Sequence, residues 1–367
     1  MSSERNLRVG VIGTGHWATA AHIPGFQACP GVEVAAICSR DRARGEEVAR
    51  AFGIPAVYTA SADMVEHTDL DLVSVVTPDD RHLADANAAI AAGLHVLCEK
   101  PLARTLGDAR RMADAAQAAG VLTKVGFTMR YAPAMMRLRE LVAGGALGQP
   151  YLFEAFLQNG QFLSPERPLH WKMTKEHAGA GAVVEYGIHG LDLATWLMGE
   201  VRRVCAAGRT LIPTRRLPSG AAARVEVDDS CAWLMDFANG ALGVCHAGWA
   251  TVGRAPGLEL RVYGSGGAAQ CILSDELPGS ALLRMANTED QRFVPTTIPA
   301  RLASRAPETE PWWRRFHGNL IRRFVDEIRA QATGEPTFAD GVRAQELLAA
   351  LIVSMDEERW VSLPLKA

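Results

Sequence analysis

The stretch Val9-Gly-Val-Ile-Gly-Thr-Gly-His-Trp-Ala18 decides the first part of the fold, because it joins an apolar strand to the pattern Gly-x-Gly-x-x-Ala. Gly13 allows a tight turn, Gly15 lets the backbone come close to a pyrophosphate, and Ala18 is small enough for helix packing. The N–H groups at the start of the following helix favour a bound anion. The stretch therefore predicts a dinucleotide-binding loop. The other loop residues expected at the cofactor are Thr14, His16 and Trp17.

Apolar runs and alanine-rich segments alternate along the first third of the chain. The further apolar runs are Val32–Cys38, Leu72–Thr77, His95–Cys98 and Val121–Gly126. The segments between them that are expected to be helical are Asp41–Phe52, Asp80–Ala92 and Thr105–Ala119. Continuous apolar strands separated by helices indicate a parallel sheet covered on both faces. We therefore expect residues 1–125 to form a Rossmann NAD(P)-binding domain of the α/β class.

The pattern changes after Pro150, where strands follow one another with short turns such as Asn239-Gly240. The expected strands are 151–159, 201–209, 225–237, 241–251, 258–263 and 268–273, and the expected helices are 132–143, 179–197, 312–333 and 340–358. Residues 126–367 are thus expected to form an α+β domain built on a large, mainly antiparallel sheet.

Composition excludes several classes of protein. The 367 residues are 48% hydrophobic and 22% charged, and 38 basic against 41 acidic side chains give a net charge of −3, so a nucleic-acid-binding face is not expected. No apolar run is long enough for a membrane span, and the polar start has no signal-peptide core, which favours a cytoplasmic protein. The seven cysteines form no CxxC pair or zinc-spaced cluster, so we expect reduced cysteines and no metal site.

The choice of cofactor is read at the end of the second strand, in Cys38-Ser39-Arg40-Asp41. An NAD enzyme usually places a carboxylate there to bind the ribose 2′-hydroxyl. Ser39 replaces a carboxylate poorly, and Arg40 could bind a 2′-phosphate and stack on adenine, which favours NADP over NAD. Alternatively, Arg40 is a solvated first-turn residue, and Asp41 reaches the ribose or caps the next helix.

Three further motifs, with the glycine loop, resemble the glucose–fructose oxidoreductase/inositol dehydrogenase/rhizopine catabolism (Gfo/Idh/MocA) family. They are Thr77-Pro78-x-x-x-His82, Cys98-Glu99-Lys100-Pro101, and Gly179-x-Gly181 with Glu185-x-x-x-His189-x-x-Asp192. The resemblance covers nearly the whole chain. It implies an N-terminal Rossmann domain and a C-terminal substrate-binding and oligomerisation domain with an open sheet. It also implies NAD(P)-dependent oxidation or reduction of a secondary alcohol on a sugar, inositol or related polyol, and a homodimer or homotetramer formed through the second domain's sheet.

The resemblance places the family's lysine at Lys100 and its active-site histidine at His189. It also marks two departures, since Glu185 stands where the family often has Asp, and Asp79 where it often has Asn. The cofactor contacts that we expect beyond the glycine loop are Ser39, Arg40, Thr77, Pro78, His82, Glu99, Lys100 and Arg130.

Hydride transfer from a carbinol requires that the hydroxyl proton leaves and that alkoxide charge is stabilised. His189 can take the proton, and Lys100 can donate to the substrate oxygen, although the reverse assignment stays open. Glu185 and Asp192 lie at helical spacing from His189, so we expect them to orient its ring and favour its charged form. Glu99 could hold the Lys100 ammonium or contact the nicotinamide ribose.

Secondary candidates lie in the loop before the catalytic helix, where Trp171 beside Lys172 could receive a polyhydroxylated ring or simply pack the loop. His22, followed by Pro24, is expected to be structural. A second hypothesis for function is a redox-neutral NAD-dependent glycosidase or lyase on the same scaffold. A third, a non-catalytic cofactor-binding protein, is disfavoured because Lys100 and His189 are both present.

Overall fold

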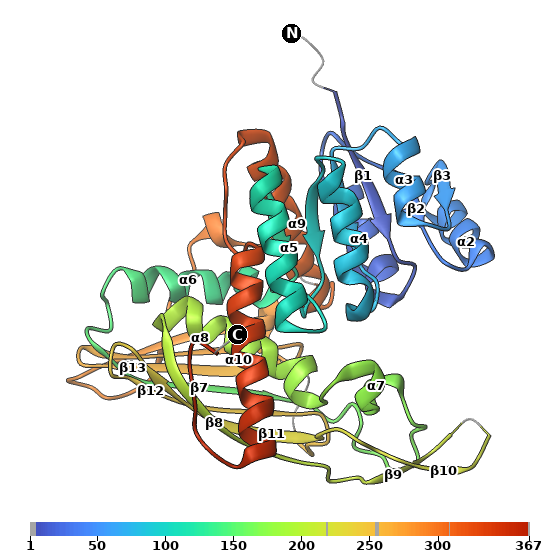
Figure 1. The fold of residues 1–367 in the computed structure, drawn as a ribbon. Helices are drawn as coiled ribbons and strands as arrows, with labels where there is room; N and C mark the ends of the chain where they lie inside the picture. The colour runs from blue at the N-terminus through green and yellow to red at the C-terminus, as the bar shows by residue number, and fades with distance from the viewer. Residues whose placement is uncertain (1–4, 218, 254–256, 308, 366–367) are drawn as a thin grey trace. The chain divides into compact units, whose positions relative to one another are not determined.

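The computed structural model describes residues 5–217, 219–253, 257–307 and 309–365. The chain forms two compact units, one of residues 1–128 with 313–345 and one of residues 129–312 with 346–367 (Figure 1). These units differ from the expected division at residue 125, because 313–345 returns to the first unit. The physical cause is visible at Lys124, a fully buried side chain whose ammonium lies 2.5 Å from Glu327 in the returning segment.

The first unit contains a six-stranded parallel sheet in the order β3-β2-β1-β4-β5-β6, which confirms the expected Rossmann architecture. Its strands are β1 (Leu7–Ile12), β2 (Val32–Cys38), β3 (Ala56–Tyr58), β4 (Leu72–Val75), β5 (His95–Cys98) and β6 (Thr123–Val125). The chain order reverses between β1 and β4. In sheets of this kind, ligands bind beyond the carboxyl ends of the strands at such a reversal.

The connections of the first unit are helical. They are η1 (Ala18–His22), α1 (Ile23–Gln27), α2 (Arg42–Phe52), α3 (Ser61–His67), α4 (Asp79–Ala91) and α5 (Leu106–Ala119), joined by α9 (Trp312–Ala330) from the end of the chain. Figure 1 shows α4 and α5 side by side. The five residues of η1 form a π-helical turn, a feature frequent at functional sites. Among the described residues, no helix combines the length and the apolarity needed to cross a bilayer.

The second unit is built on a nine-stranded sheet in the order β16-β15-β14-β13-β7-β12-β11-β8-β17. Its strands are β7 (Pro150–Gln158), β8 (Val201–Arg209), β11 (Ser230–Phe237), β12 (Leu242–Gly248), β13 (Gly257–Gly264), β14 (Gly267–Ser274), β15 (Ala281–Asn287), β16 (Val294–Pro295) and β17 (Val361–Ser362). Among the strand pairs of the described residues in this sheet, only β7 and β12 run in parallel, so the expected mainly antiparallel sheet is confirmed. A separate hairpin pairs β9 (Thr214–Arg216) with β10 (Ala222–Arg224).

Helices cover one face of this sheet, as Figure 1 shows for α6 (Pro133–Ala143) and α8 (Ile188–Met198). Gly190 lets α8 lie close to the sheet, since a Cβ there would be 3.0 Å from Leu157 and 3.3 Å from Trp233. The other helical segments are η2 (Thr128–Tyr131), η3 (Trp171–Met173), α7 (Lys175–Ala178), η4 (Val183–Gly187), η5 (Pro278–Ser280), η6 (Ala300–Leu302) and α10 (Phe338–Glu357). All seven cysteines are free thiols.

Candidate active site

The glycine loop has the geometry that a dinucleotide requires. Gly13 has φ +120°, and a Cβ at this residue would lie 2.4 Å from the carbonyl oxygen of Val76, so no other residue fits. At Gly15 a Cβ would meet no atom within 4 Å, which leaves open space directly against the backbone. Thr14 ties the loop to β2, with its hydroxyl 3.0 Å from that of Ser39. A pyrophosphate can therefore approach the main chain at Gly15.

The three residues that follow β2 differ in their exposure and contacts. Ser39 is buried and packs close to Gly45, whose hypothetical Cβ would lie 3.2 Å from that of Ser39. Arg40 is exposed, so its guanidinium is accessible to a ligand. Asp41 accepts a hydrogen bond from the Arg44 N–H at 3.1 Å and is the N-cap of α2. Of the two alternatives for Asp41, the structure shows the helix cap.

The turn after β4 is tied to the Glu-Lys-Pro turn by His82. Its Nε2 lies 2.9 Å from the Thr77 carbonyl oxygen, and its Nδ1 lies 3.0 Å from that of Pro101. Only 1% of His82 is exposed, and it thereby connects two of the expected cofactor-binding motifs. The peptide bond between Lys100 and Pro101 is cis.

Asp79, the residue that departs from the family pattern, begins α4 next to this turn. Burial is the largest influence on its carboxyl group and raises the pKa of Asp79. The guanidinium of Arg104, 3.8 Å away, opposes that shift. The substitution therefore places a desolvated acidic group directly beside the Thr77-Pro78 turn.

Three buried side chains form a group that we call the Glu99 cluster, and this group contacts the backbone of Lys100. It consists of His22, Glu99 and His317. Oε1 of Glu99 is 2.9 Å from Nε2 of His22 and 3.3 Å from Nε2 of His317. Oε2 accepts the backbone N–H of Lys100 at 3.2 Å. Among the described contacts of Glu99, none is to the Lys100 ammonium.

The electrostatics of the Glu99 cluster favour a carboxylate. Burial acts to raise the pKa of Glu99, but the hydrogen bonds and charges of the two histidines outweigh it, so this pKa lies well below its usual range. Burial is also the largest influence on His22 and lowers its pKa. The cluster is the one group among the described residues whose His, Cys, Asp and Glu atoms are arranged to hold a metal ion.

An aromatic stack connects the glycine loop to the Glu99 cluster. The ring of Trp17 lies almost parallel to that of His317, with 5.2 Å between centroids and 19° between planes. The ring of Trp313 meets Trp17 edge-on at 5.2 Å, and His16 lies 5.8 Å from Trp313. His16 and Trp17, which we expected to cover the cofactor, therefore also pack against α9.

In the second unit, His189 lies in the first turn of α8 and is buried, with 7% of the residue exposed. Asp192, one turn later, is held by Arg130 through three hydrogen bonds of 2.5–3.1 Å. Both partners are about 3% exposed or less. The guanidinium also lies 5.1 Å from the ring of Trp196. Arg130, expected at the cofactor, thus forms a buried ion pair with a predicted catalytic carboxylate.

Glu185 and the Trp171-Lys172 motif come together. The ammonium of Lys172 lies 2.7 Å from the Glu185 carboxylate and 5.5 Å from the centroid of the Trp171 ring. The indole of Trp171 is well exposed, at 45%. An accessible aromatic face beside a cation and a carboxylate offers stacking and hydrogen bonding to a sugar ring.

The helix expected at 179–197 begins later than predicted. Gly179 has φ +73° and ends α7, and the chain then turns before η4 and α8. Asp228 accepts the N–H groups of Gly181 and Val183 at 2.7 and 3.0 Å and so caps this start. A Cβ at Gly181 would lie 1.9 Å from the Asp228 carbonyl oxygen. Because Glu185 lies in the π-helical turn η4, regular i, i+4 spacing to His189 does not hold.

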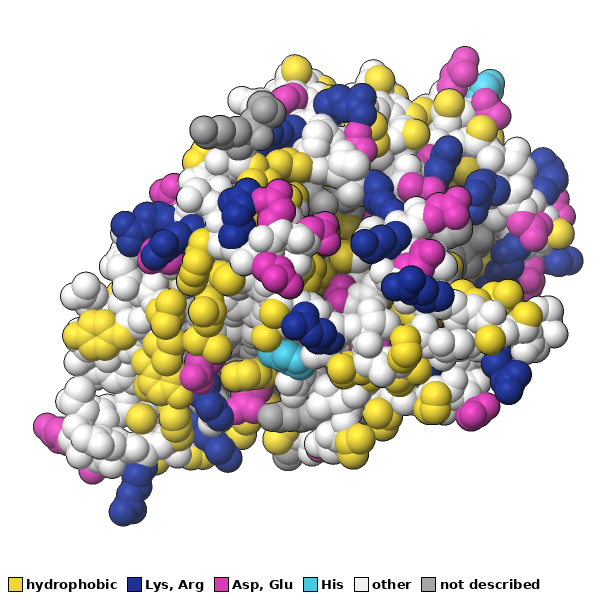
Figure 2. All heavy atoms as spheres, turned by 60° about the horizontal axis from the view of Figure 1, so that its bottom comes forward, with side chains coloured by type: hydrophobic (Ala, Val, Ile, Leu, Met, Phe, Trp, Pro, Cys, Tyr) yellow, Lys and Arg dark blue, Asp and Glu magenta, His cyan; other side chains and the backbone are white. Residues whose placement is uncertain are grey.

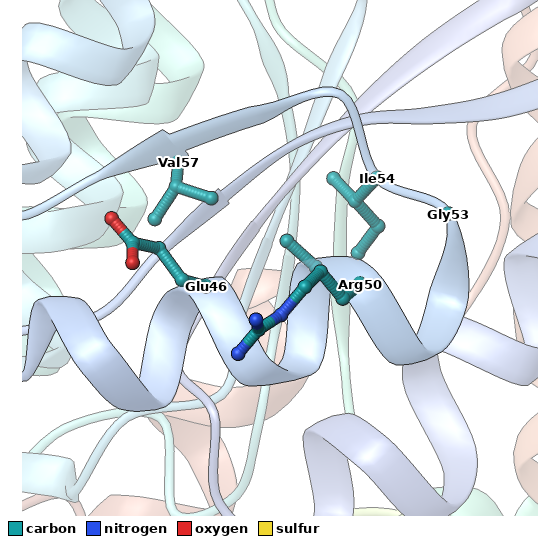
Figure 3. Close-up of a pocket in the computed structure, with 6 residues that line it drawn as sticks. Glu46, Arg50, Gly53, Ile54 and Val57 are labelled. Atoms are coloured by element: carbon teal, nitrogen blue, oxygen red, sulfur yellow. The ribbon is translucent and has the colours of Figure 1, made fainter.

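A surface pocket in the first unit contains none of the predicted site residues. It lies between α2 and β3 and is lined by Glu46, Ala49, Arg50, Gly53, Ile54 and Val57 (Figure 3). Figure 3 shows the aliphatic side chains of Ile54 and Val57 between the helix and the strand. We assign it no role in the chemistry.

Sequence reasoning missed the partners of the predicted residues. His317 and Asp228 are far from the motifs in sequence, and no spacing links them to Glu99 or Gly181. His22 was expected to be structural, and its contact with Glu99 spans 77 positions. The sequence signal that could have pointed to His22 is its position in η1, the helical segment that directly follows the glycine loop.

Two family models together match most of this chain. Residues 7–127 match the model described as "Oxidoreductase family, NAD-binding Rossmann fold", and residues 135–270 match the "GFO/IDH/MocA C-terminal domain". Levoglucosan dehydrogenase of Pseudarthrobacter phenanthrenivorans is 30% identical, over 98% of this chain and 99% of that protein. The 1,5-anhydro-D-fructose reductase of Ensifer adhaerens is 30% identical, over 77% of this chain and 82% of that protein. A solved levoglucosan dehydrogenase, in complex with NADH and L-sorbose, superposes with a TM-score of 0.89 at 29% identity, over 98% and 99% of the two chains.

Proposed function

This chain belongs to the Gfo/Idh/MocA family of NAD(P)-dependent oxidoreductases, and we propose that it transfers a hydride between NAD(P) and a secondary alcohol or keto group of a sugar, inositol or related polyol. The observation that carries the proposal is the glycine loop, whose backbone faces open space at Gly15 beside the reversal of the parallel sheet. The sugar class is supported by the names of full-length relatives and by the Trp171–Lys172–Glu185 group.

In the proposed reaction, bound NAD(P) supplies the hydride acceptor or donor. His189 takes the hydroxyl proton when the alcohol is oxidised and returns it when the ketone is reduced. Lys100 donates a hydrogen bond to the substrate oxygen and stabilises alkoxide charge. Glu185 and its ion-pair partner Lys172 bind the substrate. The ion pair of Asp192 with Arg130 holds helix α8, and with it His189, in place. The division of acid/base work between Lys100 and His189 is part of the proposal.

Cofactor preference is proposed from Arg40. Its side chain is exposed at the end of β2, where no carboxylate is available for a ribose because Asp41 caps α2. An exposed guanidinium at this place suits a 2′-phosphate, which favours NADP. The variant Arg40→Ala is expected to raise the KM for NADP⁺ about tenfold or more and to leave the KM for NAD⁺ nearly unchanged. An equal effect on both nucleotides would contradict this role.

The experiment that tests the function is turnover by the purified protein with NAD⁺ and NADP⁺ in parallel, followed by nicotinamide absorbance. Substrates would include levoglucosan, aldoses, inositols and anhydro-ketoses, the last assayed with reduced nucleotides. We expect Lys100→Ala to abolish turnover, whereas Lys175→Ala, which removes an exposed lysine, leaves it intact. No absorbance change on any substrate, with a nucleotide that copurifies, would contradict net oxidation and favour a redox-neutral reaction.

Assembly through the nine-stranded sheet and a cytoplasmic location are also proposals. The large apolar side chains exposed on the second unit include Tyr151, Leu234 and Leu242. Figure 2 shows hydrophobic side chains gathered in a band on the face that it presents. Exposed apolar surface of this kind is typical of an interface. Sedimentation of the wild type and of Leu234→Glu would test for a homodimer or homotetramer.

A further inference from the structure

The Glu99 cluster has a proton arrangement that its neighbours dictate. Nδ1 of His317 lies 2.7 Å from the backbone carbonyl oxygen of Trp313. A carbonyl oxygen only accepts hydrogen bonds, so Nδ1 carries a proton. In a neutral imidazole Nε2 would then hold a lone pair, which would face Oε1 of Glu99 at 3.3 Å. Two buried electron-rich atoms repel each other at this distance, so a positive species must lie between them.

Three species could occupy this position: a proton on His317, a proton on Glu99, or a metal ion held by all three side chains. The three ligand atoms lie within 4.8 Å of one another, so a metal ion is geometrically feasible. A divalent cation with one carboxylate would, however, leave a net positive charge buried beside Lys100, which is costly. An imidazolium balances the Glu99 carboxylate and leaves the cluster neutral.

The surroundings favour the proton on His317 over a proton on Glu99. The indole of Trp17 is stacked on the His317 ring at 5.2 Å, an arrangement that stabilises a cation. Oε2 of Glu99 accepts the Lys100 N–H, and this bond is stronger when the acceptor is charged. Burial acts to raise the pKa of Glu99, but the hydrogen bonds and charges of the two imidazoles outweigh it and hold this pKa well below its usual range.

His22 can complete its hydrogen bonds without an extra proton. Its Nδ1 lies 2.8 Å from the Ser74 hydroxyl, which can donate, while its Nε2–H donates to Glu99. Burial is the largest influence on His22 and lowers its pKa, which favours the neutral ring. The charged groups that face His317 in the cluster are therefore Glu99 at the end of β5 and, when protonated, His22 on η1.

We propose that His317 is a positioning residue, whose imidazolium joins helix α9 to the Glu99 carboxylate and thereby holds the turn that presents Lys100. Glu99 is the link, because Oε1 contacts both imidazoles and Oε2 contacts the backbone N–H of Lys100. The catalytic consequence rests on the proposed function, whereas the protonation state of His317 does not. The ammonium of Lys100 acts on the substrate, and His317 acts only through the turn.

The first test is nitrogen NMR of the protein labelled with ¹⁵N-histidine, at about pH 8, where an ordinary histidine is neutral. His67 is a matched internal control, because its Nδ1 lies 2.9 Å from the Asp63 carbonyl oxygen and its exposed ring has no carboxylate partner among the described contacts. Signals are assigned with His317→Gln and His67→Gln. We expect both nitrogens of His317 to be protonated, and the signals of His67 serve as the reference for a ring whose Nδ1 lies against a carbonyl oxygen. A non-protonated Nε2 in His317 would overturn the assignment.

The second test is kinetic. His317→Gln keeps an N–H donor toward Glu99 but loses the charge, and we expect kcat to fall about 10- to 100-fold while the KM for the nucleotide changes little. His317→Lys, which restores the charge, should recover part of kcat, and His67→Gln should match the wild type. Full kcat in His317→Gln would refute the positioning role. If the wild type turns over no substrate, the proposed function fails and the NMR result still decides the protonation state.

The third test separates a proton from a metal ion. Wild type and His317→Gln are analysed for bound metal after purification and then titrated with Zn²⁺ in a calorimeter. We expect no stoichiometric metal and no difference between the two proteins. One Zn²⁺ per chain that binds the wild type and not the variant would overturn the proton assignment in favour of a metal site.

Discussion

Two buried carboxylates, Glu99 in the first unit and Asp192 in the second, are held in opposite ways. Asp192 is held by the guanidinium of Arg130, which keeps its proton at any pH that a folded protein survives. Glu99 is held by two imidazoles, and burial lowers the pKa of one of them, His22. Asp192 is therefore bound by a guanidinium with a fixed charge, whereas Glu99 is bound by hydrogen bonds from two imidazole rings.

The largest expected effect on stability is at the Arg130–Asp192 ion pair. Arg130→Met leaves Asp192 buried without its guanidinium, and we expect the free energy of unfolding to fall by about 3–5 kcal/mol. Chemical denaturation measures this change. Adding Asp192→Leu to that variant should restore most of the loss, because the buried charge is then gone. The exposed pair Arg301–Glu140 is the control, and Arg301→Gln should cost less than about 1 kcal/mol.

Glu99→Gln should have the next largest effect, about 1.5–3 kcal/mol at neutral pH, because the amide replaces charged hydrogen bonds. The pKa of Glu99 is lowered in the folded protein, so its contribution is present above the unfolded value of about 4.5 and is lost as pH falls toward the folded value. The stability difference between wild type and variant should therefore shrink on acidification. A difference that is constant from neutral pH into the acid range would show that Glu99 does not contribute through its charge.

Gly126→Ala tests how tightly the Glu99 carboxylate is enclosed. A Cβ at Gly126 would lie 2.8 Å from Oε1 of Glu99, so we expect a loss of about 1–3 kcal/mol and a fall in kcat without a change in fold. Gly120→Ala is unsuitable as a control because its φ is positive, whereas Gly318→Ala meets no atom within 4 Å. Gly318→Ala should be neutral or slightly stabilising, and thermal unfolding of the pair gives the comparison.

The smallest expected effect is at Trp196, whose ring lies 5.1 Å from the Arg130 guanidinium. Trp196→Phe weakens this cation–π contact while keeping an aromatic ring, and we expect a loss of about 0.5–1 kcal/mol. In the Arg130→Met background the same substitution should cost measurably less. Equal costs in the two backgrounds, measured by denaturation, would mean that Trp196 contributes by packing alone.

Local pattern was enough to predict the glycine loop and five of the six strands of the first unit, but it missed the short strand β3 (Ala56–Tyr58). The apolar runs beginning at Leu7 and Val32 became β1 and β2, and Asp41 caps α2 at the expected place. These features depend on residues close in sequence, which is why pattern reveals them. The predicted start of a helix at Gly179 was wrong. The start is set by a hydrogen bond from the Gly181 N–H to Asp228, which lies 47 positions away in the sequence.

Motifs in the sequence name candidate site residues, but they do not show which side chains these residues contact. Lys100, Glu99, His189 and Asp192 stand out by motif, but the choice of partner depends on which side chains arrive from distant segments. Arg130 contacts Asp192 across 62 positions, and His317 contacts Glu99 across 218. Partners at such separations leave no periodicity in a single sequence, so the structure was needed to identify them.

The return of residues 313–345 to the first unit has a consequence for the order in which the protein is made. A ribosome synthesises the whole second-unit segment 129–312 before it reaches the residues that complete the first unit. Until then Lys124 has no Glu327, and Glu99 has no His317. The nascent first unit therefore lacks the partners of Lys124 and Glu99 until the last part of the chain has been synthesised. A fragment ending at residue 128 would remain in that incomplete state.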